Sequence, residues 1–245
     1  MKNPYKLVIK PFWAFLIILF AAQLTVAAEA RVDDSAVFSG EKRVLQRFGP
    51  LFDRVTLEMA NNQKHFLNDP VAYDLFVSRV LEPLWDSRST TSALIGRARF
   101  DRLDDVEQAA LVKAVDNTLR RYAFEGLARY SGQLFRVVDV VVNKPATMGW
   151  VQVLMESSLI PDLHFDVLIK RVNAGDWKAV DVRFKGITYV AVKKHKFRKI
   201  IEEKGVQALI GDLQIKNREY FTGICAKANI EGRPPCLTQV ASRVE

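Results

Sequence analysis

The sequence predicts an α+β fold that contains an antiparallel sheet. Helical periodicity fills the first half of the chain, four strand-like segments follow between residues 134 and 184, and helical patterns return after Gly186. Helices and strands that come in separate blocks are typical of α+β proteins, because a doubly wound parallel sheet would alternate strand and helix along the chain. The sequence contains no internal repeat and no low-complexity segment.

Residues 1–30 have the pattern of a cleavable signal peptide. Three lysines precede an apolar run that begins at Phe12, and the segment ends in the A-x-A sequence Ala28-Glu29-Ala30. The alternative is an uncleaved membrane anchor, but an anchor needs about 20 apolar residues, and Gln23 and Thr25 interrupt this run. No cysteine lies near the cleavage site, which excludes a lipoprotein anchor. We expect a soluble, exported mature chain.

Cleavage after Ala30 would leave 215 of the 245 residues, which suits one domain with a sizeable core. We place this domain at residues 31–217 and a C-terminal tail at residues 218–245. Loss of three lysines and Glu29 lowers the net charge from +8 to +6. A moderate positive charge favours acidic partners or anionic membrane surfaces and does not by itself indicate nucleic acid.

Two helical stretches occupy the first half of the chain. Apolar residues recur at three- and four-residue steps from Ser35 to about Glu82, and Pro70 divides this stretch into two amphipathic runs. Pro83 ends the second run, and short helical or turn character follows from Trp85 to Leu103. A long helix is predicted from Asp104 to Tyr130, because its two leading aspartates suit the positive end of a helix dipole.

The four strands are predicted at Leu134–Val142, Val151–Glu156, His164–Val172 and Trp177–Phe184, with a turn at residues 173–176 between the last two. In the last strand Val180, Val182 and Phe184 alternate with charged residues. This alternation predicts one dry face and one wetter face. A basic and then apolar helix should follow Gly186, with another helix around Val206–Leu213.

Two cysteines, Cys225 and Cys236, lie in the predicted tail. In an oxidising compartment we expect them to form a disulfide, with two unrelated free thiols as the alternative. The tail contains no histidine, so a metal site there is not expected.

A search for catalytic residues finds no positive signal. The three histidines, His65, His164 and His195, lie far apart and form no metal-binding pair, and no glycine belongs to a nucleotide-binding or nucleophile motif. Asp104 and Asp105 are better explained as a helix start. We expect no enzymatic activity, no cofactor and no metal.

The strongest polar feature is a basic cluster that includes Lys193, Lys194, Lys196 and Arg198. It is either a solvated helix face or a docking surface for an acidic protein or for lipid headgroups. Nucleic-acid binding ranks last, because the cluster lacks interleaved stacking aromatics.

The order of segments resembles the MlaC family of periplasmic phospholipid-binding proteins, also called the toluene-tolerance family. The segments that carry the resemblance, which covers about Ser35 to Asn217, are "EPLWD", "ALIGRA", "QAALVKAVDNTLRRYAFEGLARY", "WKAVDVRFKGITYVAVKKHKF" and "GVQALIGDLQIKN". In the fourth segment Trp177, Asp181, Gly186 and Phe197 fall where the family has them. The chain departs from the family at Thr188, where a serine is usual, and at Lys193-Lys194, where a Tyr-Arg pair is usual.

The resemblance implies a helical layer and a curved antiparallel sheet of about four strands that enclose an apolar lipid cavity. It implies a periplasmic, non-enzymatic carrier of glycerophospholipid that maintains outer-membrane lipid asymmetry. Its partners would be an inner-membrane ABC transporter complex with an MCE-domain protein and an outer-membrane lipoprotein–porin complex, and we expect a monomer. The side chains expected to line the cavity are Tyr122, Val138, Val140, Val153, Met155, Phe165, Val167, Ile169, Val180, Val182, Phe184 and Phe197.

Three alternatives remain open at this stage. A related branch of the family, HpnM, is associated with hopanoid biosynthesis, so the ligand could be a hopanoid or another apolar lipid. An exported protein–protein adaptor would have an ordinary solid core and no extractable ligand. A periplasmic lipid hydrolase ranks last, because the sequence offers no candidate nucleophile.

Overall fold

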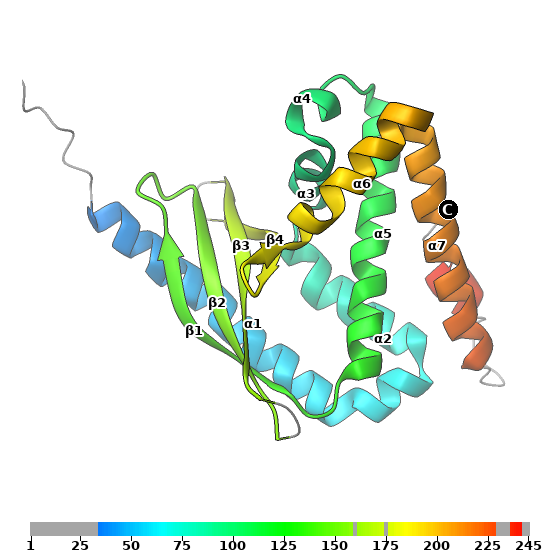
Figure 1. Ribbon diagram of the computed structural model, residues 1–245. Coiled ribbons are helices and arrows are strands. Elements are labelled where there is room, and N and C mark those ends of the chain that lie inside the picture. The colour runs from blue at the N-terminus through cyan, green and yellow to red at the C-terminus, as the bar shows by residue number, and fades with distance from the viewer. Residues whose placement is uncertain (1–33, 159–160, 174–175, 229–235, 242–245) are drawn as a thin grey trace, which may run out of the picture. The chain divides into compact units, whose positions relative to one another are not determined.

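A sheet with helices packed beside it forms the fold of this chain, seen in a computed structural model (Figure 1). The structure describes residues 34–158, 161–173, 176–228 and 236–241. From Ser35 onward they belong to one compact unit, Ser35–Glu245. The predicted signal peptide lies outside the described residues.

Helices come before and after the sheet, as the sequence predicts. The first group is α1 (Asp34–Asn68), α2 (Pro70–Phe76), the π-helical η1 (Val77–Leu81), the 3₁₀-helical η2 (Glu82–Leu84), α3 (Ser87–Ile95), α4 (Arg97–Phe100) and α5 (Asp105–Arg129). The second group is α6 (Tyr189–Lys204), α7 (Val206–Lys227) and the π-helical η3 (Leu237–Ala241). No helix of the described residues is long and apolar enough to cross a bilayer.

Side-chain caps explain where several helices begin. The carboxylate of Asp69 accepts a hydrogen bond from the Ala72 amide at 3.1 Å, and Pro70 stands at the first helical position of α2, where its missing N–H costs nothing. Asp86 caps α3 in the same way, and Asp104 caps α5 by accepting from the Glu107 amide at 2.8 Å. The helix starts predicted at Pro70 and Asp104 are therefore explained by hydrogen bonds and backbone preferences of neighbouring residues.

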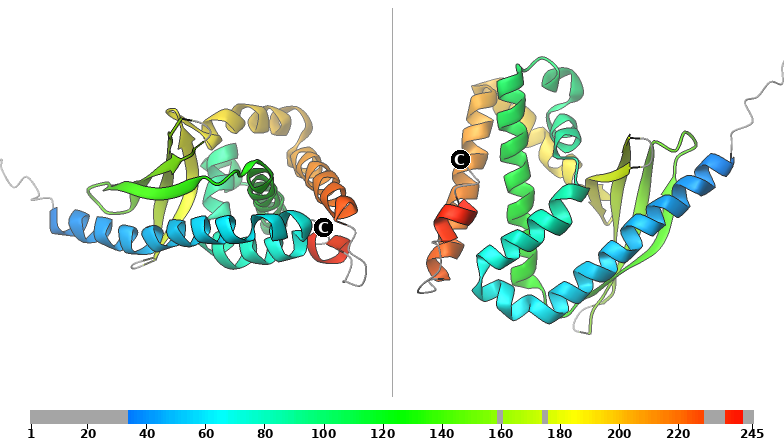
Figure 2. Two further views of the ribbon diagram at one scale, coloured as in Figure 1. Left: turned by 90° about the horizontal axis from the view of Figure 1, so that it is seen from below. Right: turned by 180° about the vertical axis from the view of Figure 1, so that it is seen from behind.

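The sheet is an open antiparallel meander in the order β1 (Leu134–Val142), β2 (Met148–Glu156), β3 (Leu163–Asn173), β4 (Asp176–Phe184) and β5 (Ile187–Thr188). The predicted α+β class and the curved antiparallel sheet are confirmed, with β5 as a short additional strand. One face of the sheet packs against α1, as both views of Figure 2 show, and we call it the inner face. Its core includes Val44 and Phe48 of α1 together with Val151, Ile169 and Trp177 of the sheet.

Bulges on β4 and β1 interrupt the strand alternation. On β4, Ala179 pairs with Ile169 and Asp181 pairs with Leu168, so Val180 is an extra residue without a partner of its own. The bulge is anchored from α3, because the Thr90 hydroxyl donates to the Val180 carbonyl at 2.7 Å. A similar shift follows Val137 on β1, where Val138 is the extra residue.

The segment from Trp177 to Phe197 joins the sheet to the second helical group, and its family-like residues have structural roles. Trp177 is buried against α1, and Asp181 accepts hydrogen bonds from the Val182 and Val190 amides, which ties β4 to the start of α6. Gly186 has a φ of 80°, which suits the tight β4–β5 turn. The Thr188 hydroxyl accepts from the Ala191 amide at 3.0 Å and so caps α6, a role that serine could also fill.

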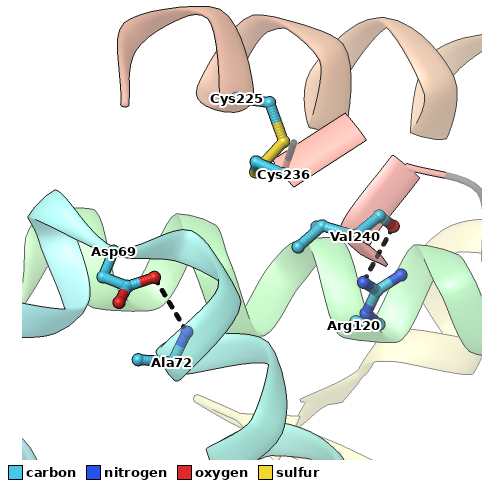
Figure 3. The surroundings of a disulfide bond; sticks show 6 residues. All are labelled: Asp69, Ala72, Arg120, Cys225, Cys236 and Val240. Atoms are coloured by element: carbon cyan, nitrogen blue, oxygen red, sulfur yellow. Dashed lines mark hydrogen bonds between the residues drawn. A yellow bond between two sulfur atoms is a disulfide. The ribbon is translucent and has the colours of Figure 1, made fainter. Parts of the chain in front are cut away.

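A disulfide joins Cys225 at the end of α7 to Cys236 just before η3, with Cα atoms 5.4 Å apart (Figure 3). It ties η3 to α7. In η3 Val240 is fully buried, and its carbonyl accepts a hydrogen bond from Arg120 of α5 at 3.0 Å. The boundary predicted between domain and tail at residue 217 falls within α7, which continues to Lys227.

Candidate binding cavity

A largely apolar cavity of about 430 Å³ lies between the inner face of the sheet, α1, the η1–η2 segment and α5. Ligand pockets in proteins typically measure about 300–1,000 Å³. Its lining consists of Phe48, Leu51, Phe52, Val55, Val77, Leu81, Glu82, Leu84, Trp85, Asp116, Leu119, Arg120, Tyr122, Ala123, Val167, Ala179, Val182 and Tyr189.

Helix α1 supplies one wall of the cavity. Phe48, Leu51, Phe52 and Val55 recur at three- and four-residue steps, so they form a continuous apolar stripe along the helix. The sheet supplies the facing wall through residues of β3 and β4. These are Val167 and Val182, which are paired across the two strands, and Ala179, which precedes the β4 bulge.

Helix α5 supplies the third wall with Leu119, Tyr122 and Ala123. The Tyr122 ring meets the Tyr189 ring edge to face, with ring centroids 5.8 Å apart, so two phenols from different elements stand together beside the cavity. Burial raises the pKa of the Tyr189 phenol, and the neighbouring Tyr122 adds to that shift. Tyr189 therefore remains neutral at physiological pH.

Two of the three charged residues of the lining, Arg120 and Asp116, are held by other protein groups. Arg120 is buried in an ion pair with the buried Asp74, donates to the Val240 carbonyl, and lies over the Phe221 ring at 4.4 Å. Asp116 accepts a hydrogen bond from the Ser87 hydroxyl at 2.5 Å. A carboxylate and a guanidinium that already have protein partners leave the interior of the cavity suited to apolar chains.

Apolar side chains dominate the lining of this cavity. Its lining contains no histidine, cysteine or serine, and the described residues include no group of three or more histidines, cysteines and carboxylates that could hold a metal ion. What the arrangement offers is an apolar space walled by aliphatic and aromatic side chains, which can take apolar groups out of water.

Three of the expected lining residues, Tyr122, Val167 and Val182, border the cavity. Most of the others lie in packed regions. Val140, Val153 and Ile169 are buried between the sheet and α1, and Phe165 packs against that core. Met155 is half-buried on β2, and Phe197 belongs to a separate core formed with α3, α5 and α7.

The expectation that Val180 shares a face with Val182 and Phe184 is wrong, because the bulge reverses the alternation at that point. Val180 instead lines a second hollow of about 520 Å³ on the outer face of the sheet, together with Arg198 and Lys170. Val138, the extra residue of the β1 bulge, is 44% exposed, and Phe184 is 43% exposed at the end of β4. These three side chains do not border the cavity.

Sequence reasoning missed most of the helical wall. The apolar periodicity of residues 48–55 was visible, but periodicity does not distinguish a helix that packs against a core from one that borders a cavity. The η1–η2 segment was missed for a different reason. Leu81, Leu84 and Trp85 enter the cavity because the chain changes there from α-helix to π-helix and then to 3₁₀-helix.

The residues of the predicted docking surface all lie on α6. Lys194 and Lys196 are exposed, Lys193 is half-buried, and Arg198 turns towards the outer hollow, where its guanidinium lies beside Gly96. The histidines are distributed as the sequence suggests. His65, His164 and His195 are exposed and lie on three different elements.

Comparisons with known proteins agree with the fold. A family model described as MlaC protein matches residues 51–215. A phospholipid-binding protein from Ralstonia solanacearum, solved in complex with a phospholipid at 1.53 Å resolution, has a similar fold with a TM-score of 0.54 and 17% sequence identity. The match covers 69% of this chain and 98% of the Ralstonia chain. No curated protein matches the sequence.

Proposed function

Since this chain belongs to the MlaC family, we propose that it binds the acyl chains of a glycerophospholipid in the apolar cavity and carries the lipid between membranes. The observation that supports this most directly is the cavity itself, because most of its lining is aliphatic or aromatic and both Arg120 and Asp116 have protein partners. The similar fold of a phospholipid-bound protein from Ralstonia solanacearum is consistent with this proposal.

The energetics of transfer explain why such a cavity is needed. At about 0.8 kcal/mol per buried CH₂, two ~16-carbon chains are stabilised by roughly 25 kcal/mol in a bilayer. A carrier must offer a comparable dry surface, or the lipid will not leave the membrane. Walls contributed by α1, α5, η1–η2 and the sheet can surround a chain on several sides, which one helix or one sheet face alone could not do.

The wider role that we propose is that of a periplasmic carrier without catalytic activity. Residues 1–30 would direct export and then be removed. The protein would exchange lipid with an inner-membrane ABC transporter complex that contains an MCE-domain protein and with an outer-membrane lipoprotein–porin complex, and so maintain outer-membrane lipid asymmetry. The other expected lining residues, including Val140, Val153 and Phe165, would contact the ligand if the sheet and α1 move apart to admit it.

Native mass spectrometry of protein purified from a periplasmic extract tests the binding proposal, followed by solvent extraction and lipid identification. We expect one stoichiometric glycerophospholipid. If a hopanoid or another apolar molecule is found instead, the cavity would still be the binding site, but the ligand and the pathway would differ from those proposed. A protein that is empty and takes up no lipid from vesicles would contradict the carrier proposal and favour an adaptor.

The basic surface of Lys193, Lys194, Lys196 and Arg198 is proposed to dock the carrier onto anionic lipid headgroups or onto an acidic partner at the membrane. A Lys193→Glu, Lys194→Glu, Lys196→Glu variant should transfer lipid between membranes more slowly, because three positive charges become negative. It should unfold at the same temperature as the wild type. Transfer at the wild-type rate would remove the docking role.

A further inference from the structure

The β4–β5 turn and the start of α6 carry an unusual charge distribution. Residues 182–201 contain seven lysines and arginines and no aspartate or glutamate. The ion pairs of this segment involve Arg183, which binds Asp166, and Lys199, which binds Glu203. Among the described residues, Lys185, Lys194 and Lys196 have no carboxylate partner, so their charge is available to an external group.

Large apolar side chains are exposed among these lysines. Ile187 of β5 and Val192 of α6 are each 60% exposed, and Phe184, which pairs with Ile187 across the turn, is also exposed. On α6, Val192 and Lys196 are four residues apart and therefore lie on one face of the helix. We call Phe184, Lys185, Ile187, Val192 and Lys196 the turn patch.

The turn patch continues a wall of the cavity to the surface. Val182 borders the cavity, and Phe184 follows two residues later on the same face of β4. Its cross-strand partner Ile187 extends that face further. Tyr189, two residues after Ile187, borders the cavity again. The residues on both sides of the turn, Val182 and Tyr189, therefore line the cavity, and the turn between them reaches the surface.

The turn also projects away from the helix that closes the cavity on its other side. In the left view of Figure 2 the yellow β4–β5 turn and the start of α6 lie on the side of the unit opposite α1. A surface that touches the turn could therefore approach it without contacting α1.

We propose that the turn patch is the port through which acyl chains enter and leave the cavity, and that it seats on the surface of an anionic bilayer. Aliphatic side chains interspersed with lysines are typical of segments that insert into the interface of anionic membranes, because the apolar groups enter the acyl boundary while the cations bind headgroups. An acidic protein surface would attract the lysines equally, but it gives no reason for Ile187 and Val192 to be exposed beside a cavity wall. This inference rests on the proposed function, since it assigns a route to the same ligand.

Vesicle binding and lipid transfer test the port with matched variants. The patch variant is Ile187→Ser, Val192→Ser, and its control is Ile215→Ser, Val106→Ser, which removes the same two residue types from exposed positions on α7 and α5. The charge variant is Lys185→Glu, Lys196→Glu, and its control is Lys113→Glu, Lys216→Glu, at exposed positions on the same two helices. Each protein is incubated with vesicles of phosphatidylglycerol and phosphatidylethanolamine or of phosphatidylcholine alone.

The patch variant should lose vesicle binding and fluorescent-phospholipid transfer by roughly tenfold or more, because two exposed apolar anchors are removed. The charge variant should lose binding to the anionic vesicles in particular, and added salt should weaken wild-type binding in the same way. Both controls should behave as the wild type. Native mass spectrometry should show the wild-type amount of bound lipid in both controls, because none of their substituted residues borders the cavity or belongs to the turn patch.

Equal loss in the patch variant and its control would overturn the port, and so would transfer by a wild type that never associates with vesicles. Unchanged vesicle binding with slower transfer only when the membrane complexes are present would assign the turn patch to a protein interface, which also overturns the proposal. Failure of the proposed function can be distinguished from failure of the port. If the wild-type protein binds no lipid, native mass spectrometry shows this before any vesicle is added.

Discussion

Two stretches of helix α5 carry similar apolar residues but face different interiors. Leu111, Ala114 and Val115 are fully buried in a core that α3, α6 and α7 complete. One to two turns later, Leu119 and Ala123 are only half-buried and border the cavity, and Leu119 packs only against the edge of that core. The residue types hardly differ, so the hollow arises from what lies opposite the helix.

The opposite elements explain that difference. The first stretch faces regular α-helices, whose side chains can interdigitate along their length. The second faces η1 and η2, where the helical repeat changes twice within eight residues, and a sheet whose β4 strand is bulged at Val180. Irregular elements cannot follow the surface of a straight helix, and space remains between them. The comparison shows that a binding cavity can be built from ordinary core residues when their partners are irregular.

The largest expected effect on stability comes from the Arg120–Asp74 ion pair, because Arg120 lies in the second stretch of α5. Asp74→Ala should lower the free energy of unfolding by about 3–5 kcal/mol, because it leaves the Arg120 guanidinium buried without its carboxylate. Urea denaturation measures the change. The Asp74→Ala, Arg120→Leu double variant should recover much of the stability. A single-variant loss below about 1 kcal/mol would show that water reaches the cavity wall and replaces the carboxylate.

Truncation of one leucine in each stretch tests the contrast directly. Leu111→Ala should cost about 2–5 kcal/mol of unfolding free energy, because it opens a cavity in a packed core. Leu119→Ala should cost less, about 1–2 kcal/mol in lipid-free protein, because this side chain packs only against the edge of the core and also borders open space. Chemical denaturation of both lipid-free variants provides the comparison. Equal costs would mean that the cavity closes when no ligand is bound.

Replacing an alanine of the cavity wall by a larger residue should change stability least and lipid binding most clearly. Ala123→Phe should fill part of the cavity, reduce lipid uptake by about tenfold and change the unfolding free energy by about 1 kcal/mol at most. Ala114→Phe in the packed stretch serves as the control and should destabilise the protein by about 1–3 kcal/mol or more through overpacking. Uptake of a fluorescent phospholipid and thermal unfolding distinguish the two. Full uptake by Ala123→Phe would place the ligand elsewhere.

The sequence predicted the strands well and the last helix poorly. The first strand was predicted with its observed bounds, because valine-rich segments between turn residues have few other interpretations. Helix α7 was expected to end near Leu213 but continues to Lys227. Asn217 and Gly223 are weak helix formers, and the helix persists because Asn217 donates to the Ala114 carbonyl at 3.1 Å and to the Thr118 hydroxyl. That support comes from α5 and is invisible in local sequence.

The site was predicted less completely than the fold, for a related reason. Strand alternation identified Val167 and Val182, but the same rule failed at Val180, because the hydrogen bond from Thr90 that stabilises the bulge comes from ninety residues earlier in the chain. The helical wall, including Phe48 and Phe52, required knowledge of which helix crosses the sheet.

By itself, the sequence determined the fold class, the strand positions, the helix starts at capping residues and the family resemblance, because these depend on neighbours within a few positions along the chain. Only the tertiary structure decided where the interior is packed and where it is hollow. It also decided that Arg120 is neutralised by Asp74 and that Val180 faces away from the cavity. Packing and burial are relations between distant segments, and a single sequence records the residues but not which of them meet.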